Sequence, residues 1–132
     1  MKRPEEALQR SIVQHLTLRL EPPWIFWANT AQRGTRKPWE QAILKALGQK
    51  AGLPDLFVLG PDSKLIGIEC KAPPEMGKRG EVSKAKPRLN EAQQKMFPTL
   101  AGLRVPVIVV RDVDDAIAAL STMGAKFRGR VR

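Results

Sequence analysis

Three charged residues lie at the ends of two apolar segments of the chain. Asp55 opens the first segment, residues 55–59, and Glu69 and Lys71 lie at the end of the second, residues 64–71. The Gly-Pro-Asp-Ser turn between them predicts a hairpin of two strands. The start of one hairpin strand lies beside the end of the next, so Asp55 is expected close to Glu69. Side chains alternate between the two faces of a strand, so Glu69 and Lys71 share one face.

Two carboxylates beside an ammonium group can bind a hard divalent cation. Mg²⁺ commonly uses one or two carboxylates together with waters and substrate phosphate. The charge spacing taken alone favours a simpler explanation, a surface ion pair between Lys71 and one of the carboxylates. Polar residues elsewhere in the chain favour the metal site.

Two of these polar residues occupy positions on apolar helix faces. At about 100° per residue, Glu5 falls near the middle of the stripe that contains Leu8 and Ile12, and Gln93 falls in the middle of the apolar face of its own helix. A buried polar group without a partner costs about 1–3 kcal/mol, so both side chains are expected to meet polar groups inside the fold. The alternatives are a fraying helix end for Glu5 and a capping role for Gln93.

Hydrophobic periodicity predicts an α/β protein whose helices and strands alternate along the chain. The predicted elements are a helix over 4–20, a strand over 24–28, a short helix over 39–48, the two hairpin strands, a helix capped by Asn90 that runs to about residue 100, a buried strand over 105–110 and a helix from 112 that ends before Gly124. Trp24 and Trp27 are expected in the core, and so is Cys70.

The composition indicates one domain with a polyanionic partner. The chain has 132 residues and a net charge of +10, which suits a single domain over residues 1–132 that binds nucleic acid. It contains no apolar run of about 20 residues and no apolar signal-peptide region at its N-terminus, so a cytoplasmic protein without membrane contact is expected. Cys70 is the only cysteine. Any metal would therefore be held mainly by oxygen.

Basic residues gather in three segments that lack apolar periodicity, the first of which is the basic loop over residues 29–38. Residues 73–88 are rich in Pro, Gly, Lys and Arg, which predicts a long mobile loop, and residues 124–132 form a basic tail that is expected to fray. The candidate DNA-binding residues are Arg33, Arg36, Lys37, Lys78, Arg79, Lys84, Lys86 and Arg88. Phosphate contacts of this kind supply affinity without reading the base sequence. A solvated loop is the alternative, which the clustering of one charge sign disfavours.

The hairpin carries a resemblance to a known family. Pro-Asp at 54–55, thirteen intervening residues and Glu-Cys-Lys at 69–71 resemble the bipartite motif of the PD-(D/E)XK nuclease superfamily. The G-L-P-D-L form, the early E-E-A-L-Q and the R-L-N-E-A-Q around Gln93 resemble its VRR-NUC branch, from Glu5 to about Val110. The resemblance implies a restriction-endonuclease-like αβββαβ core with a central mixed sheet flanked by helices. The order predicted from periodicity agrees, apart from the helix inserted before G-L-P-D.

The resemblance also implies an activity, a metal and residue roles. The expected activity is hydrolysis of DNA phosphodiester bonds by an endonuclease that uses Mg²⁺, or Mn²⁺ in its place, and acts in DNA repair on branched DNA such as Holliday junctions or flaps. The implied metal ligands are Asp55, Glu69, the backbone carbonyl of Cys70 and, directly or through water, Glu5. The implied catalytic residues are Asp55, Glu69, Lys71 and Gln93. Lys71 would act on the attacking water and the phosphate, and Gln93 would hydrogen-bond near Lys71 or the phosphate.

Other functions and an assembly remain open at this point. A catalytically silent DNA-binding protein would keep the fold and the basic loops, and an RNA-binding accessory protein would explain the charge alone. Opening a symmetric junction needs two cuts, which favours a twofold homodimer. Trp39, Ile43 and Leu47 share one stripe on the short helix, which either forms this interface or packs on the domain's own sheet. Trp39 could also stack on a base.

Overall fold

The computed structural model describes residues 4–29, 38–72 and 88–129 of the chain. The elements are α1 (Pro4–Arg19), β1 (Ile25–Ala28), α2 (Pro38–Ala46), β2 (Leu56–Gly60), a 3-10 turn (Pro61–Ser63), β3 (Lys64–Cys70), α3 (Glu91–Gly102), β4 (Val107–Val110) and α4 (Val113–Thr122). The predicted helices and strands are therefore present, with small shifts at their ends. No helix in these ranges combines the length and the apolar character needed to cross a membrane.

The strands form one mixed sheet in the order β1-β2-β3-β4. β1 and β3 both pair antiparallel with β2, and β4 pairs parallel with β3. β2 and β3 form the predicted hairpin, which ends at the pair of Gly60 with Lys64. Asp62 and Ser63 turn the chain there with φ angles of 62° and 59°, a conformation that aspartate tolerates better than most residues. The predicted mixed sheet flanked by helices is confirmed.

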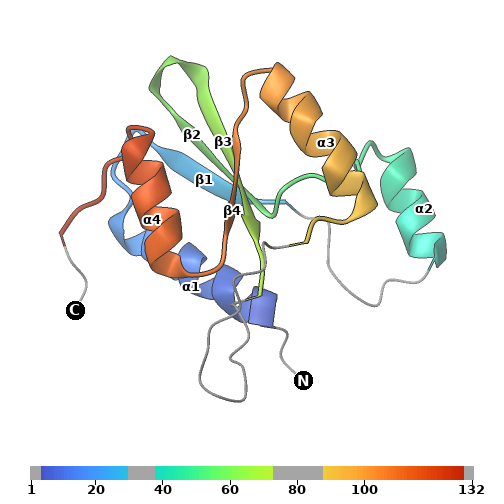
Figure 1. Ribbon diagram of the computed structural model, residues 1–132, viewed down its shortest axis with the longest axis horizontal. Helices are drawn as coiled ribbons and strands as arrows, with labels where there is room; N and C mark the ends of the chain where they lie inside the picture. The colour runs from blue at the N-terminus through green and yellow to red at the C-terminus, as the bar shows by residue number, and fades with distance from the viewer. Residues whose placement is uncertain (1–3, 30–37, 73–87, 130–132) are drawn as a thin grey trace.

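The main hydrophobic core lies between one face of the sheet and helices α1 and α4. Figure 1 shows these two helices on one side of the sheet and α3 on the other. The core residues are Leu8, Ile12, Leu16, Leu20, Trp24, Leu56, Val58, Ile66, Ile68, Cys70, Val110, Ala116, Leu120 and Ala125. Each large aliphatic side chain buried here contributes about 1.5–3 kcal/mol relative to leaving it exposed. The predictions that Trp24 and Cys70 belong to the core are confirmed.

The opposite face of the sheet is less completely covered. Among the described elements, α3 packs on this face and lies against β4. At the other edge, Ile25 and Trp27 of β1 are 55% and 42% exposed. The prediction that Trp27 lies in the core is therefore wrong. An edge strand lacks a neighbour on one side, and Trp27 instead stacks on Phe57 of β2, with ring centroids 5.6 Å apart.

β4 is the second edge strand, and its burial also differs from the prediction. Val110 is buried, whereas Val107, Ile108 and Val109 are half-buried. The apolar run had predicted a fully buried strand. A strand at the end of the sheet order has one side without a neighbouring strand, so its side chains keep partial contact with solvent.

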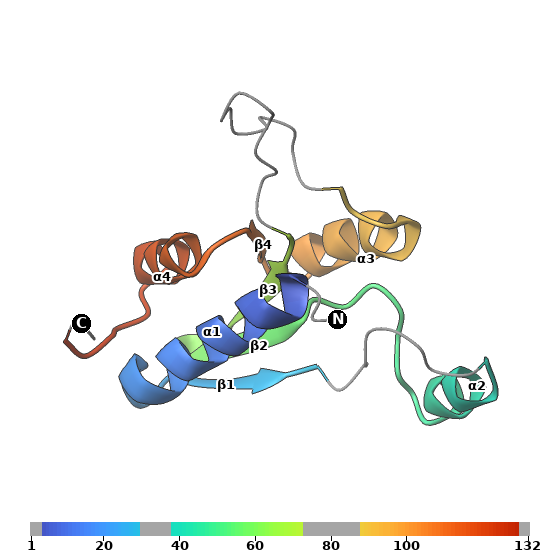
Figure 2. The same cartoon turned by 90° about the horizontal axis from the view of Figure 1, so that it is seen from below.

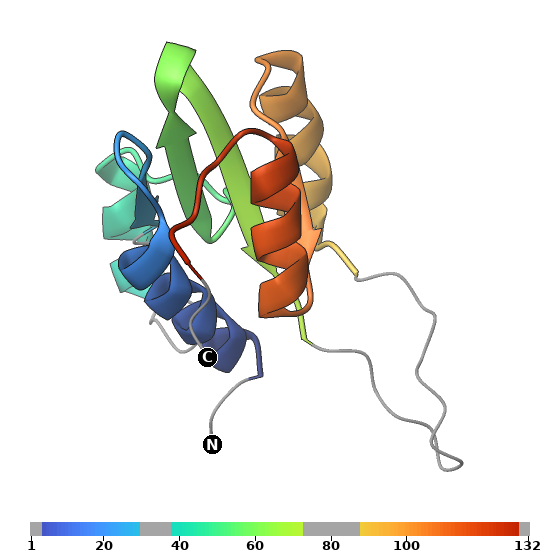
Figure 3. The ribbon, with the colours of Figure 1, turned by 90° about the vertical axis from the view of Figure 1, so that its left-hand side faces the viewer.

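The chain after α4 is attached to the end of α1. Leu20 forms an isolated bridge with Phe127, and the backbone N–H of Arg128 donates to the carbonyl oxygen of Arg19 at 2.7 Å. The guanidinium of Arg19 also lies over the Phe127 ring, 5.8 Å from its centroid. The prediction of a fraying tail is therefore wrong for this segment, and Figure 3 shows it returning beside α1. Residues 130–132 of the basic tail lie outside the described ranges.

Candidate functional site

The candidate site lies at the edge of the sheet where β3 ends and β2 begins. The register that pairs Leu56 with Ile68 places Asp55 beside Glu69, one position further toward this edge. Asp55 Oδ2 accepts a hydrogen bond of 2.8 Å from the backbone N–H of Cys70. The two carboxylates are therefore neighbours, as the hairpin geometry predicted.

Close packing holds the segment that carries Asp55. Gly52 has a φ of +84°, and a Cβ at this position would lie 2.5 Å from the carbonyl oxygen of Ala92 in the first turn of α3. A Cβ on Gly67 of β3 would lie 2.6 Å from the ring of Pro54, which is fully buried. The Gly-Leu-Pro-Asp segment is thus fitted between α3 and β3 at two places where a side chain has no room. Asp55 is positioned by backbone packing on both sides.

Glu69, Gln93 and Lys71 form a hydrogen-bonded network beside Asp55. Glu69 is 2% exposed, and its Oε2 accepts a hydrogen bond of 2.6 Å from Gln93 Nε2. Lys71 Nζ donates to Gln93 Oε1 at 3.0 Å and lies 3.4 Å from Glu69 Oε2. Gln93 therefore meets polar groups inside the fold, close to Lys71, as predicted.

The first turn of α3 fixes the orientation of the Gln93 amide. Asn90 caps the helix by accepting a 2.9 Å hydrogen bond from the Gln93 N–H, and Gln93 Oε1 accepts a 3.1 Å hydrogen bond from the Asn90 N–H. The predicted capping box is confirmed. Because Oε1 accepts hydrogen bonds from both Asn90 and Lys71, the amide nitrogen is the group that faces Glu69. Gln93 thus fulfils the capping and the site role at the same time.

The carboxylates offer an oxygen-rich pair of ligands. Among the residues that the structure describes, no three His, Cys, Asp or Glu side chains form a group that could hold a metal ion. Glu5 is half-buried in the first turn of α1 and does not form such a trio with Asp55 and Glu69. The pair that remains fits Mg²⁺, which takes one or two carboxylates and completes its shell with water and phosphate oxygens.

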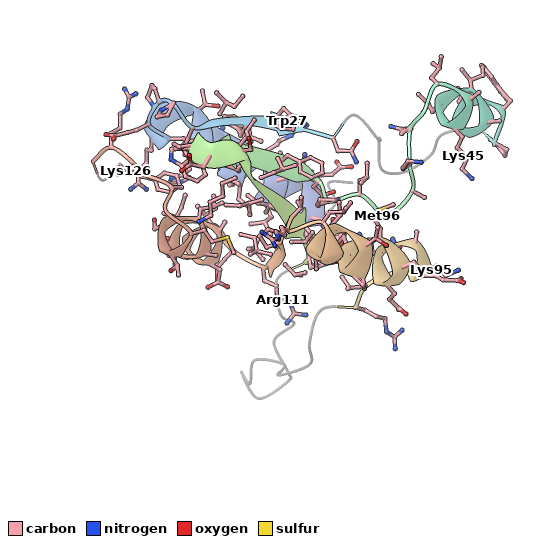
Figure 4. The ribbon with its side chains drawn as sticks, turned by 90° about the horizontal axis from the view of Figure 1, so that it is seen from above. Trp27, Lys45, Lys95, Met96, Arg111 and Lys126 are labelled. Atoms are coloured by element: carbon pink, nitrogen blue, oxygen red, sulfur yellow. The ribbon has the colours of Figure 1, made fainter. Side chains whose placement is uncertain are left out.

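The sheet brings two further polar residues to this edge that the sequence analysis did not identify. The N–H of Asn29, directly after β1, donates to the carbonyl oxygen of Asp55 at 2.8 Å. The N–H of Lys71 donates to the carbonyl oxygen of Val110 at 2.9 Å, and Cys70 pairs with Val110, so the next residues, Lys71 and Arg111, are neighbours. Figure 4 labels Arg111, which directly follows β4. Both side chains are half-buried. A polar residue directly after an apolar strand was the available signal, but its relevance depended on the strand order.

The basic residues expected to contact DNA fall mostly outside the described ranges. Arg88 is described and exposed. The candidates that lie outside are Arg33, Arg36, Lys37, Lys78, Arg79, Lys84 and Lys86.

The short helix α2 projects away from the sheet and the other helices, as Figure 2 shows. Its apolar stripe is solvent-accessible: Trp39 is 60% exposed, Ile43 51% and Leu47, just beyond the helix, 79%. The alternative that this stripe packs on the domain's own sheet is therefore wrong.

Comparisons with known proteins connect this geometry to a fold. No protein-family model and no curated protein sequence matches the chain. A solved structure named "VRR_NUC domain protein" matches 92% of this chain and 88% of its own, with a TM-score of 0.55 and 20% identical residues. A match with 20% identical residues shows a shared fold. The chain therefore has the fold of a VRR-NUC domain, as its Pro-Asp and Glu-Cys-Lys motifs predicted.

Proposed function

We propose that the protein is a divalent-metal-dependent DNA endonuclease. The observation that carries this proposal is the network of Glu69, Gln93 and Lys71 beside Asp55, at the edge of a sheet with a VRR-NUC fold. Two carboxylates and an ammonium group at this edge are the groups expected for hydrolysis of a phosphodiester with a divalent metal.

A purely structural ion pair explains this network poorly. An exposed pair typically contributes about 0–1 kcal/mol to stability. Here the side chain of Glu69 is 3% exposed and that of Lys71 14%. A charged pair that is removed from water at such a position often stabilises the fold no more than a well-packed apolar pair does. A function that needs the charges accounts for their burial.

The two carboxylates would hold the metal. Asp55, Glu69 and the backbone carbonyl of Cys70 would bind Mg²⁺, with Mn²⁺ able to replace it, and Glu5 would act through a water because it forms no trio with the other carboxylates. Bound there, the ion would stabilise the charge that develops on the phosphate and activate a water nucleophile.

Lys71 and Gln93 would act on the substrate side of the site. An ammonium group has three N–H donors, and one of them is used by Gln93 Oε1. Glu69 Oε2 also lies 3.4 Å from this nitrogen, so a remaining donor can contact the attacking water or a phosphate oxygen. Gln93 bonds to both Lys71 and Glu69, so it would keep the ammonium and the carboxylate at a constant separation. This positioning is the contribution we assign to Gln93.

The substrate we propose is branched DNA, such as a Holliday junction or a flap, and the pathway is DNA repair. The net charge of +10 supports a nucleic-acid partner. Arg111 beside Lys71, together with exposed Arg88, would contact phosphates near the cut. Such contacts position DNA without reading its sequence, which suits an enzyme that selects structure.

A twofold homodimer would supply two cuts on a symmetric junction. The exposed stripe of Trp39, Ile43 and Leu47 is the surface we assign to the interface, since it stays solvent-accessible in the single chain. Light scattering should report a dimer for the wild-type protein and a monomer for Ile43→Glu. A dimer that is indifferent to this charge would contradict the interface.

Cleavage of end-labelled duplex, flap and four-way junction DNA tests the proposed activity. Each substrate is incubated with Mg²⁺, Mn²⁺ or EDTA, and Glu69→Gln serves as a matched variant of similar shape without the charge. We expect cleavage of the branched substrates with either metal, and none in EDTA or with the variant. Binding without cleavage under every condition would identify a DNA-binding protein that lacks activity. A labelled RNA duplex is included in the binding measurement, and binding to this RNA alone would point to an RNA-binding protein.

A further inference from the structure

An exposed tryptophan lies on the same sheet face as the candidate site. Trp27 pairs with Phe57, which is two residues along β2 from Asp55. Residues two apart in a strand share a face, so Trp27, Phe57, Asp55 and Glu69 all project from the face opposite the main core. At a rise of about 3.4 Å per residue, the row of Trp27 lies about 7 Å from the row of the carboxylates.

This spacing matches the dimensions of a nucleic-acid strand. Successive bases of one strand are about 3.4 Å apart along a duplex. Trp27 also lies one strand, about 4.8 Å, to the side of Asp55 and two strands to the side of Glu69. A nucleic-acid strand whose phosphate lies at the carboxylates would therefore bring a base that is about two or three nucleotides away to the position of Trp27. Figure 4 shows Trp27 on β1, at the edge of the sheet that is opposite to the edge near α3.

The ring is held firmly but remains accessible. Trp27 stacks on Phe57 with 27° between the ring planes, and Phe57 is 9% exposed. Trp27 itself is 42% exposed. Shielding Phe57 from water would need only an aliphatic side chain. A rigid indole supported from beneath and exposed at the surface is the arrangement by which proteins stack nucleobases.

We propose that Trp27 stacks on an unpaired base next to the scissile phosphate. The inference rests on the proposed nuclease function and specifies its substrate class. Within a duplex, neighbouring bases cover both faces of each base. The indole can therefore stack only on a base that has left the duplex stack. The substrate class is therefore DNA with at least one unpaired nucleotide beside the cut, such as a flap or a frayed junction arm.

Tryptophan fluorescence tests the contact without any cleavage. In a Trp39→Phe background the remaining indoles are Trp24, which is buried, and Trp27. Titrations in EDTA use a flap DNA, a blunt duplex of the same sequence and a thymine oligonucleotide. We expect strong quenching by the flap and the oligonucleotide and little by the duplex. Equal quenching by all three probes would overturn the proposal. A fall in fluorescence with rising protein concentration before DNA is added would also overturn it, because Trp27 would then contact a second protein chain.

Affinity measurements with matched variants complete the test. Trp27→Leu keeps an apolar cover over Phe57 but cannot stack, so its affinity for flap DNA should fall about tenfold or more, with duplex affinity unchanged. Trp27→Phe should restore most of the loss, and Leu18→Ala, at an exposed apolar position on α1, is the control. An equal loss on both DNAs would contradict base stacking. If wild-type protein binds flap DNA through Trp27 but cleaves nothing with any metal, the nuclease function fails and the stacking site stands.

Discussion

The two faces of the sheet are built from the same strands but carry different kinds of buried side chain. On the face toward α1 and α4, Ile66, Ile68 and Cys70 of β3 are completely buried among apolar side chains. On the face toward α3, the alternate residue Glu69 is equally inaccessible but is surrounded by Gln93 and Lys71. The residues of the two sets alternate along one strand, so strand periodicity alone assigns them to different faces.

Under the proposed function, this difference would assign stability to one face of the strand and activity to the other. The apolar face is closed by two helices, and its side chains need only shape and volume. The polar face is covered by one described helix, whose first turn supplies a hydrogen-bonding amide to the site. Substitutions on the two faces should therefore have separable effects, and the following tests examine that separation.

The largest expected effect on activity is from Glu69→Ala. Loss of this carboxylate should abolish cleavage while folding remains nearly intact. DNA affinity should also persist, because the variant removes a negative charge beside the phosphate. The matched variant is Ile68→Ala, one residue away on the apolar face, which should lower the free energy of unfolding by about 2–5 kcal/mol and leave the activity of the folded fraction unchanged. Urea unfolding and gel-based cleavage measure the two outcomes. Cleavage by Glu69→Ala within tenfold of wild type would refute the metal assignment.

Lys71→Ala should have the next largest effect. In the proposed function the ammonium group acts on water and phosphate rather than on the metal, so the cleavage rate should fall by about 10²–10³ while metal affinity persists. Single-turnover kinetics report the rate, and calorimetric titration with Mn²⁺ reports the affinity. A loss of metal binding equal to that of Glu69→Ala would show that Lys71 organises the carboxylates instead.

Gly52→Ala examines the packing that joins the Asp55 segment to α3. The new Cβ would meet the Ala92 carbonyl oxygen at 2.5 Å, and the φ of +84° is unfavourable for alanine. We expect a loss of stability of about 1–3 kcal/mol together with a reduced cleavage rate. Gly102→Ala is the control, because a Cβ there meets nothing within 4 Å. Unchanged stability in Gly52→Ala, measured by thermal unfolding, would show that the loop can shift without cost.

The smallest effect is expected at the far end of α3. Arg104 follows the helix with a φ of 64°, and Val105 N–H donates to the Leu100 carbonyl oxygen at 2.8 Å, as in a helix-ending motif that favours glycine. Arg104→Gly should therefore raise the free energy of unfolding by about 1 kcal/mol and leave cleavage unchanged. A change in cleavage rate would mean that the two ends of α3 are coupled.

Much of the site followed from local patterns in the chain. The turn between two apolar segments was enough to place Asp55 beside Glu69, because a hairpin pairs the start of one strand with the end of the next. The capping box of Asn90 and Gln93 was equally readable, since its hydrogen bonds span three residues. The alternation of side chains along a strand placed Glu69 and Lys71 on one face of the sheet. These features depend on neighbours that are close in sequence, and the order of the core elements was predicted for the same reason.

Features that depend on distant contacts were decided by the tertiary structure. Trp27 and the strand over 105–110 have the composition of buried segments, yet both lie in edge strands because of the strand order. The same order brought Asn29 and Arg111 to the site from opposite edges. Apolar character records the tendency of a side chain to leave water, but whether another element arrives to cover it depends on packing across the whole chain. That packing left Trp27 exposed on the face that carries Asp55 and Glu69.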